Sequence, residues 1–107
     1  LRFMELLLEH PVQVALLSQR GAVIVNVPAP ARYAVHKLIV ATERGAQFRT
    51  KANKDLLQAA ALISYLQEHM PEEMAKTWKD VDGRGPTWKK KSAQGRAALR
   101  KLIPTLL

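Results

Sequence analysis

Apolar positions change their spacing near residue 28, from short β-branched runs to helical periodicity. The clearest strand pattern is AVIVNV at 22–27, which is rich in β-branched residues and bounded by Gly21 and Pro28. Residues 12–17 alternate over part of their length and predict another strand. Residues 2–8 predict a third strand, although ELLLE also fits a helical turn. We therefore expect two or three strands within residues 1–27.

Helical patterns follow between residues 30 and 103. The first predicted helix covers about 30–44, with Pro30 in its first turn and Gly45 after its end. A positively charged loop is expected at 46–52, and Asn53 is expected to cap a second helix. A third helix is predicted at about 71–80 and a fourth at about 87–103, before Pro104. This order, strands followed by about four helices, predicts an α+β fold.

The apolar faces of these helices predict the core. In the first helix the predicted core face is Val35, Leu38, Ile39 and Thr42. In the second it is Leu56, Ala59, Ala60, Ile63 and Leu66, widened by Leu57, Ala61 and Leu62. Trp78 and Trp88 are expected to be core anchors, because tryptophan buries a large area.

Composition fits one domain over residues 1–107, with 48% hydrophobic residues. A domain of this length buries about 65% of the surface of its unfolded chain. Because Leu1 opens in the middle of an apolar pattern, we expect the chain to be the C-terminal part of a longer protein that has lost an N-terminal portion.

The excess of basic over acidic residues indicates the class of binding partner. Seventeen Lys and Arg against nine Asp and Glu give a net charge of +8, which favours anionic partners. The absence of cysteine excludes disulfides and thiolate metal sites. No run approaches the 18–20 apolar residues of a membrane span, and the order of a signal peptide is missing, so we expect a cytoplasmic protein.

Lys37 and Arg44 are the first candidate functional residues, because their side chains can bind phosphate. Seven residues apart on one helix, they lie on the same face, about 10 Å apart along the axis. Together they can bind a polyphosphate, although lone cations on such a helix usually face water. Asp55 is expected in the first turn of the second helix, where the helix dipole favours a carboxylate. Alternatively, Asp55 orients Lys37 or Lys54, or binds Mg²⁺ through water.

The C-terminal segment is basic and has no acid after Asp82. Its cations are Arg84, Lys89, Lys90, Lys91, Arg96, Arg100 and Lys101. They form either a surface for RNA or an acidic protein, or a solvated face behind an apolar stripe. His36 is expected to be a packing or surface residue, since it points about 100° away from Lys37 on a helix. His10 and His69 are isolated, so no metal-ligand spacing is present.

The segment VNVPAPARYAVHKLIVATER, followed by KANKDLLQAAALISYL, resembles the later half of a bacterial nucleotidyltransferase-like family. This family is related to the abortive-infection type nucleotidyltransferase toxins, and the resemblance covers roughly residues 1–66. In such proteins a strand leads into a helix that bears a Lys and then an Arg. A short loop then brings in a helix with a basic residue followed by Asp. Here Lys37, Arg44 and the Lys54-Asp55 pair fall in that order.

The resemblance implies a polymerase-β-like fold that uses NTP and Mg²⁺. It implies that Lys37 touches nucleotide phosphates, that Asp55 supports the site, and that Arg44 and Lys54 help to bind the nucleotide. The family's opening Gly-Ser motif with paired aspartates, which would bind Mg²⁺, has no match in this sequence. We therefore expect transfer of a nucleoside monophosphate to an unknown acceptor by the full-length protein, and an inactive chain on its own. The alternative is a non-catalytic basic module that binds nucleic acid or an acidic protein.

Overall fold

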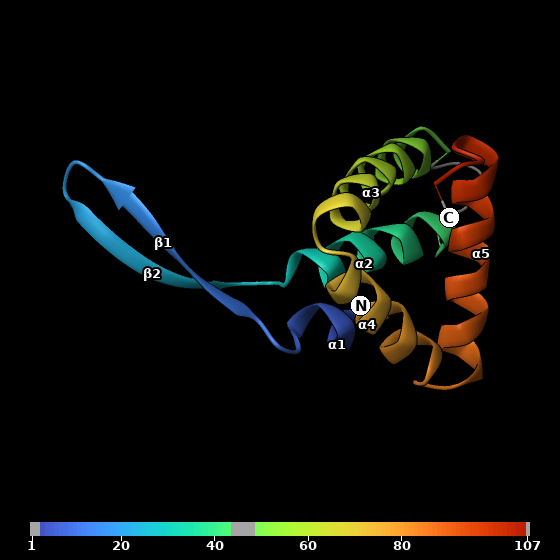
Figure 1. The fold of residues 1–107 in the computed structure, drawn as a ribbon, viewed down its shortest axis with the longest axis horizontal. Helices are drawn as coiled ribbons and strands as arrows, with labels where there is room; N and C mark the ends of the chain where they lie inside the picture. Colours follow the sequence, from blue (N-terminus) through green and yellow to red (C-terminus); the bar gives the residue numbers. More distant parts are fainter. Residues whose placement is uncertain (1–2, 44–48, 107) are drawn as a thin grey trace.

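A computed structural model of the chain describes residues 3–43 and 49–106. Within these residues the fold is α+β, as predicted: a two-stranded antiparallel sheet and a body of helices (Figure 1). In chain order the elements are α1 (Met4–Leu8), β1 (Val12–Ser18), β2 (Gly21–Val27), α2 (Pro30–Glu43), α3 (Arg49–His69), α4 (Pro71–Asp82) and α5 (Pro86–Leu102). None of the described helices has both the length and the apolar character needed to cross a membrane.

Helix α2 is the centre of the helical body, and α1, α3, α4 and α5 all pack against it. Its buried residues include Val35, Leu38 and Ile39, each with no exposed surface, as their helical spacing predicted. Helix α3 contributes Ala59, Ala60, Ile63 and Leu66 to the same core. The site helix α2 is therefore held on several sides by packing rather than by its own helix propensity.

Prolines and a left-handed glycine set the boundaries of the last two helices. Pro71 and Pro86 stand in the first turns of α4 and α5, where the missing N–H costs nothing. Gly85 joins the two helices with φ 129°, a backbone conformation that side chains disfavour. Trp78 and Trp88 are partly buried against the core, in agreement with their prediction as anchors.

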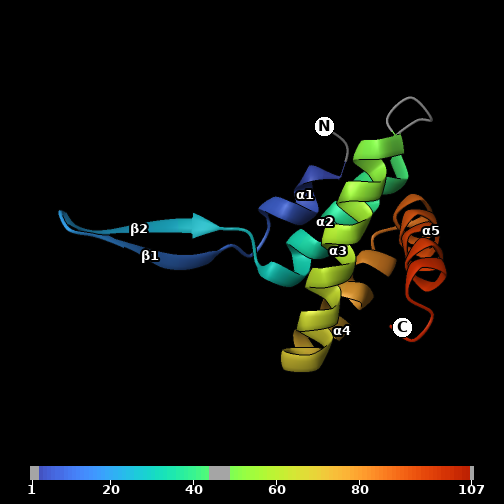
Figure 2. The same ribbon diagram turned by 90° about the horizontal axis from the view of Figure 1, so that it is seen from above.

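The β1–β2 hairpin projects away from the helical body (Figures 1 and 2). Its register pairs Val12 with Val27 and Ser18 with Gly21, which leaves a two-residue turn. Leu17 is 81% exposed and Ile24 is 63% exposed, so the hairpin is held mainly by its own backbone ladder.

The structure decides between two alternatives at the N-terminus and corrects the start of α3. Residues 4–8 form the helical turn that the sequence left open as the alternative to a third strand, because Phe3 and Leu6, three residues apart, are both buried in the core. A strand would place these two side chains on opposite faces. The predicted loop at 46–52 is wrong from Arg49 onward, since α3 begins there. No Gly or Pro separates Arg49 from Asn53, so nothing in the sequence stops the helix from extending back past the expected cap.

The apolar face of α3 is narrower than predicted. Leu57 is 57% exposed and Ala61 is exposed, whereas Leu62 is partly buried against the core. The sequence alone shows a wide apolar stripe, but α2 and α4 cover only part of it.

Helix α5 approaches α2 closely at Gly95. A Cβ atom at this position would lie 2.6 Å from Cγ of Leu38 and 2.8 Å from its Cδ2. Leu38 has no exposed surface and follows Lys37 directly in sequence. The absence of a side chain at Gly95 thus lets α5 pack on the core side of the helix that carries Lys37.

Candidate functional site

Lys37 and Asp55 come together across the contact between α2 and α3. Nζ of Lys37 lies 3.4 Å from Oδ1 of Asp55, and their side chains are only 22% and 12% exposed. Nζ of Lys37 also lies 5.6 Å from the ring centroid of Tyr33, one turn earlier on α2. The ammonium is thus held between a carboxylate and an aromatic ring. An ion pair so little exposed is screened less by salt than a surface pair.

Asp55 does not occupy the first turn of its helix, contrary to the prediction. Because α3 begins at Arg49, Asp55 is its seventh residue. The field of the helix dipole falls off within the first turn, so it does not account for a carboxylate here. The contact with Lys37 does, and it corresponds to the alternative in which Asp55 orients that lysine.

A small hollow of about 180 Å³ adjoins the ion pair. Its lining comes from three helices: Leu7 on α1, Asp55 on α3, and Tyr33, His36, Lys37 and Val40 on α2. The α2 residues lie three or four positions apart in the pairs 33/36, 33/37, 36/40 and 37/40, a spacing that places side chains along one helical face. The hollow therefore combines one cation, one carboxylate, two ring side chains and an apolar wall.

His36 lines this hollow, although the sequence suggested only a packing or surface role. Burial lowers the pKa of His36 below its ordinary value, and the neighbouring Lys37 ammonium lowers it further. The imidazole is therefore neutral at pH 7, when one ring nitrogen donates and the other accepts. Its Nε2 atom is buried and has no hydrogen-bond partner in the described part of the chain. Consecutive residues on a helix point about 100° apart, but this rotation still allows His36 and Lys37 to line the same hollow.

The other two predicted site residues are Lys54 and Arg44. Lys54 is exposed on α3, next to Asp55, and its nucleotide-binding role stays a prediction. Arg44 lies outside the described residues, which also leaves its role a prediction. The structure thus brings together the Lys37 and Asp55 members of the predicted set.

The described residues do not fit a magnesium site. Among the described residues that line the hollow, Asp55 is the only carboxylate, and it faces an ammonium that would repel a cation. Among the described residues there is no group of three or more His, Cys, Asp or Glu side chains that could hold a metal ion. Hard cations need several oxygen ligands, and this hollow offers one carboxylate.

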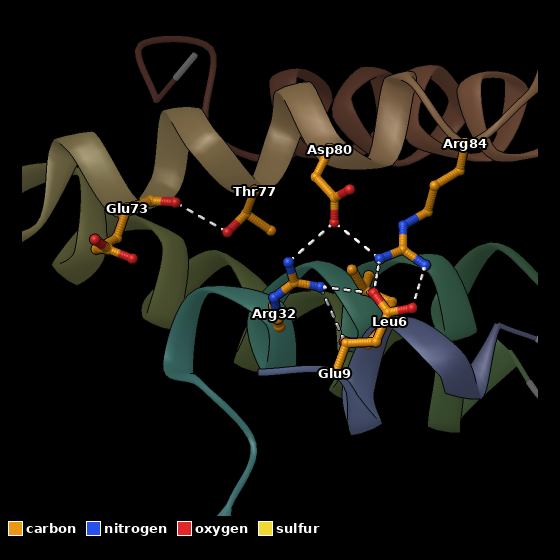
Figure 3. A network of polar contacts seen from close by, with 7 residues as sticks. All are labelled: Leu6, Glu9, Arg32, Glu73, Thr77, Asp80 and Arg84. Carbon is orange, nitrogen blue, oxygen red and sulfur yellow. Dashed lines mark hydrogen bonds and ion pairs between the residues drawn. The ribbon is translucent and has the colours of Figure 1, made fainter. Parts of the chain in front are cut away.

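A second polar cluster fixes the start of α2 (Figure 3). Arg32 lies 3.0 Å from Asp80 on α4 and 3.5 Å from Glu9, which follows α1. Arg84 binds Asp80 at 2.9 Å and also pairs with Glu9. Arg32 further donates to the backbone oxygen of Leu6 at 3.4 Å. The cluster ties α1, α2 and α4 together one turn before His36 and next to Tyr33.

The pKa values in this cluster predict a loss of stability in acid. The hydrogen bond from Arg84 lowers the pKa of Glu9. Burial by itself raises the pKa of Asp80, but the hydrogen bond and charge of Arg84, with those of Arg32, bring it below its ordinary value. Both carboxylates therefore stabilise the fold at pH values above their ordinary pKa values of 4.5 and 3.8. This stabilisation is lost as the pH falls through their lower pKa values in the folded protein.

Urea unfolding at about pH 6 and about pH 3 measures this effect. The double variant Glu9→Gln, Asp80→Asn should lose less stability between the two pH values than the wild type. Glu72→Gln serves as a control, since Glu72 is an exposed acid on α4 for which the described part of the chain shows no ion pair. Equal acid sensitivity of the double variant and the wild type would contradict the assignment.

The C-terminal cations divide between internal contacts and an open surface. Lys91 pairs with Glu43 at 2.9 Å, Arg96 pairs with Asp82 at 3.2 Å, and Arg84 belongs to the cluster of Figure 3. Arg96 also stacks on Trp78, with its guanidinium carbon 4.1 Å from the ring centroid. Lys89, Lys90, Arg100 and Lys101 are exposed on α5. The basic surface is therefore smaller than the sequence suggested.

Comparison with known proteins identifies the family. A family model described as a nucleotidyltransferase matches residues 1–82, which include α1 to α4 and both members of the Lys37–Asp55 pair. Neither a curated protein nor a solved structure matches the chain. The match covers most of the 107 residues and extends past the roughly 66 residues of the sequence resemblance. A nucleotide is the substrate that this family implies, and the chain belongs to this nucleotidyltransferase family.

Proposed function

We propose that this chain supplies the phosphate-binding helix of a nucleotidyltransferase that moves a nucleoside monophosphate from an NTP to an acceptor. The observation that carries the proposal is the Lys37–Asp55 ion pair beside a hollow, in a chain of this family. Lys37 binds a phosphate of the NTP as a compact point charge. Asp55 acts as a positioning residue that holds the ammonium in place before the nucleotide arrives.

The reaction exchanges a phosphoanhydride bond of the NTP for a phosphate ester bond to the acceptor. An acceptor oxygen attacks the α-phosphorus of the NTP, a new oxygen–phosphorus bond forms, and the bond from the α-phosphorus to the bridging oxygen breaks. Pyrophosphate leaves, and the proton of the acceptor hydroxyl passes to solvent or a base. Lys37 offsets negative charge on the phosphates. Such electrostatic stabilisation is a main contribution of the protein to catalysis of phosphoryl transfer.

Magnesium ligands are proposed to lie outside these 107 residues. The family's Gly-Ser motif with paired aspartates is absent from the sequence, and the hollow does not fit the ion. We propose that this chain is the C-terminal part of a longer, cytoplasmic bacterial protein, in which an N-terminal portion carries that motif. The relation of this family to the abortive-infection type nucleotidyltransferase toxins is part of the same proposal.

A second candidate function concerns α5. Its exposed cations Lys89, Lys90, Arg100 and Lys101 stand on a helix without acids. This surface suits the phosphates of an RNA, as the acceptor or as a non-catalytic ligand, and it would equally hold an acidic protein. Binding to RNA through such contacts weakens steeply as salt rises.

The test is a labelling experiment with the full-length gene product. The protein is incubated with each of the four NTPs labelled at the α-phosphate, with Mg²⁺ or with EDTA, and with tRNA, a protein mixture or small hydroxyl compounds as acceptor. We expect label to move to one acceptor class only with Mg²⁺. Absence of transfer from all four NTPs to every acceptor would remove the catalytic proposal. Retention of tRNA at low salt but not at high salt would then support the binding module, and no retention at low salt would remove it.

A further inference from the structure

Tyr33 presents an aromatic ring beside the Lys37–Asp55 pair. The residue is 40% exposed, and its ring centroid lies 5.6 Å from Nζ of Lys37. The two residues are four apart on α2, a spacing that places side chains next to each other on one helical face. A partly open ring and an ammonium therefore border the same hollow.

The size and lining of the hollow suit one flat group. Pockets for whole small ligands usually have about 300–1,000 Å³. The hollow of about 180 Å³ is smaller, so it holds a single ring-sized part of a ligand. Leu7 and Val40 give it an apolar wall, whereas the charged atoms of Lys37 and Asp55 are paired with each other. The apolar wall and the Tyr33 ring suit an uncharged aromatic group.

We propose that Tyr33 is the platform on which the base of the nucleotide stacks, while Lys37 binds a phosphate of the same molecule. The inference rests on the proposed function, and it assigns to Tyr33 the recognition of a nucleoside phosphate as opposed to a bare polyphosphate. Base and phosphate are joined by a single ribose, and this short linkage matches a ring and an ammonium that are neighbours on one helix. Every base has a π face, so Tyr33 contributes affinity without selecting one base.

A purely structural role of Tyr33 makes a different prediction. If the ring only positioned Lys37 through its cation–π contact, its loss would weaken every phosphate ligand alike. If the ring stacks on the base, its loss weakens nucleotides and leaves an inorganic polyphosphate unaffected. The two roles are therefore separated by comparing ligands with and without a base.

The experiment measures dissociation constants of ATP, UTP and inorganic tripolyphosphate for the full-length gene product with Mg²⁺. Base–aromatic stacking is worth about 1–3 kcal/mol, or roughly 5- to 100-fold in affinity. We expect Tyr33→Leu to raise the dissociation constants of ATP and UTP by about tenfold or more, with tripolyphosphate unchanged. Tyr33→Phe keeps the ring and should stay within about twofold of the wild type. Tyr65→Leu is the matched control, because Tyr65 is 59% exposed on α3 and does not line the hollow.

Two results would overturn the inference while the proposed function stands. One is a wild type that binds tripolyphosphate as tightly as ATP and UTP, a comparison that needs no variant. The other is a Tyr33→Leu protein that binds the nucleotides as well as the Tyr65→Leu control does, or that loses tripolyphosphate equally. A wild type that binds none of the three ligands would instead remove the proposed function, and the inference with it.

Discussion

Replacing Lys37 with alanine should lower the rate of NTP-dependent labelling by the full-length protein about a hundredfold or more. The loss follows from removing a positioned cation from the phosphates, since one such donor is commonly worth about 10²–10³ in kcat. Lys37 is held in place by Asp55 at 3.4 Å, so its charge needs little reorganisation when the nucleotide binds. The measurement is the initial rate of label transfer at saturating NTP.

Lys76→Ala is the matched control for this substitution. Lys76 is 75% exposed on α4, and its ion pair with Glu73 is long, at 3.9 Å. Its loss should leave the rate within about twofold, because exposed pairs contribute little. Thermal unfolding of both variants checks that they remain folded. A Lys37→Ala protein as active as Lys76→Ala would contradict the role of Lys37.

The same pair of residues can be tested for coupling. If Asp55 acts by positioning Lys37, Asp55→Asn should reduce the rate in the wild-type background and have little further effect in the Lys37→Ala background. Equal reductions in the two backgrounds would show that Asp55 acts independently of the lysine.

Gly95→Val should lower the free energy of unfolding by about 2–3 kcal/mol, a typical cost of overpacking a core. The new Cβ would lie 2.6 Å from Cγ of Leu38, which has no exposed surface. The modest gain in helix propensity on replacing glycine offsets only part of this cost. Urea unfolding followed by circular dichroism measures the change.

Ala97→Val controls for the propensity of valine, since Ala97 is exposed on the same helix. It should change the stability by about 0.5 kcal/mol at most. In a Leu38→Ala background Gly95→Val should be much less costly, because the smaller side chain leaves room for the new Cβ. A Gly95→Val protein as stable as Ala97→Val would show that the approach of α5 to α2 is not tight.

Strong local signals made most of the fold predictable from the sequence. The β-branched run before Pro28 predicted β2, and Pro30 predicted the start of α2. The helices expected from about residues 71 and 87 begin at Pro71 and Pro86. The buried face of α2 also follows directly from helical spacing, with Val35 and Leu38 fully buried as expected.

The two elements that the sequence left open or misplaced, α1 and the start of α3, depend on tertiary contacts. A five-residue helix has too few residues for a periodic signal, and α1 is stabilised by burying Phe3 and Leu6. The sequence did not predict the start of α3 at Arg49, because Asn53 was expected to be the N-cap. No residue between Arg49 and Asn53 marks an earlier helix start.

The site was predictable in part. The family resemblance implied that Lys37 and Asp55 share a site, and the structure places their side chains in contact. Their chemical roles stay proposals. Tyr33 and His36 carried no such signal, since a ring on a helix is usually a packing residue. Their place in the hollow depends on α1 and α3 closing over α2, which no local pattern reports.

If Lys37 binds the phosphates of a nucleotide, the Lys37→Ala protein should bind nucleotides more weakly. Dissociation constants of ATP and tripolyphosphate are measured with Mg²⁺ for the full-length wild type, Lys37→Ala and Lys76→Ala. Since a charge-assisted contact is worth about 1.5–3 kcal/mol, Lys37→Ala should raise both constants about tenfold or more, and Lys76→Ala should not. Equal dissociation constants for the three proteins would contradict the account.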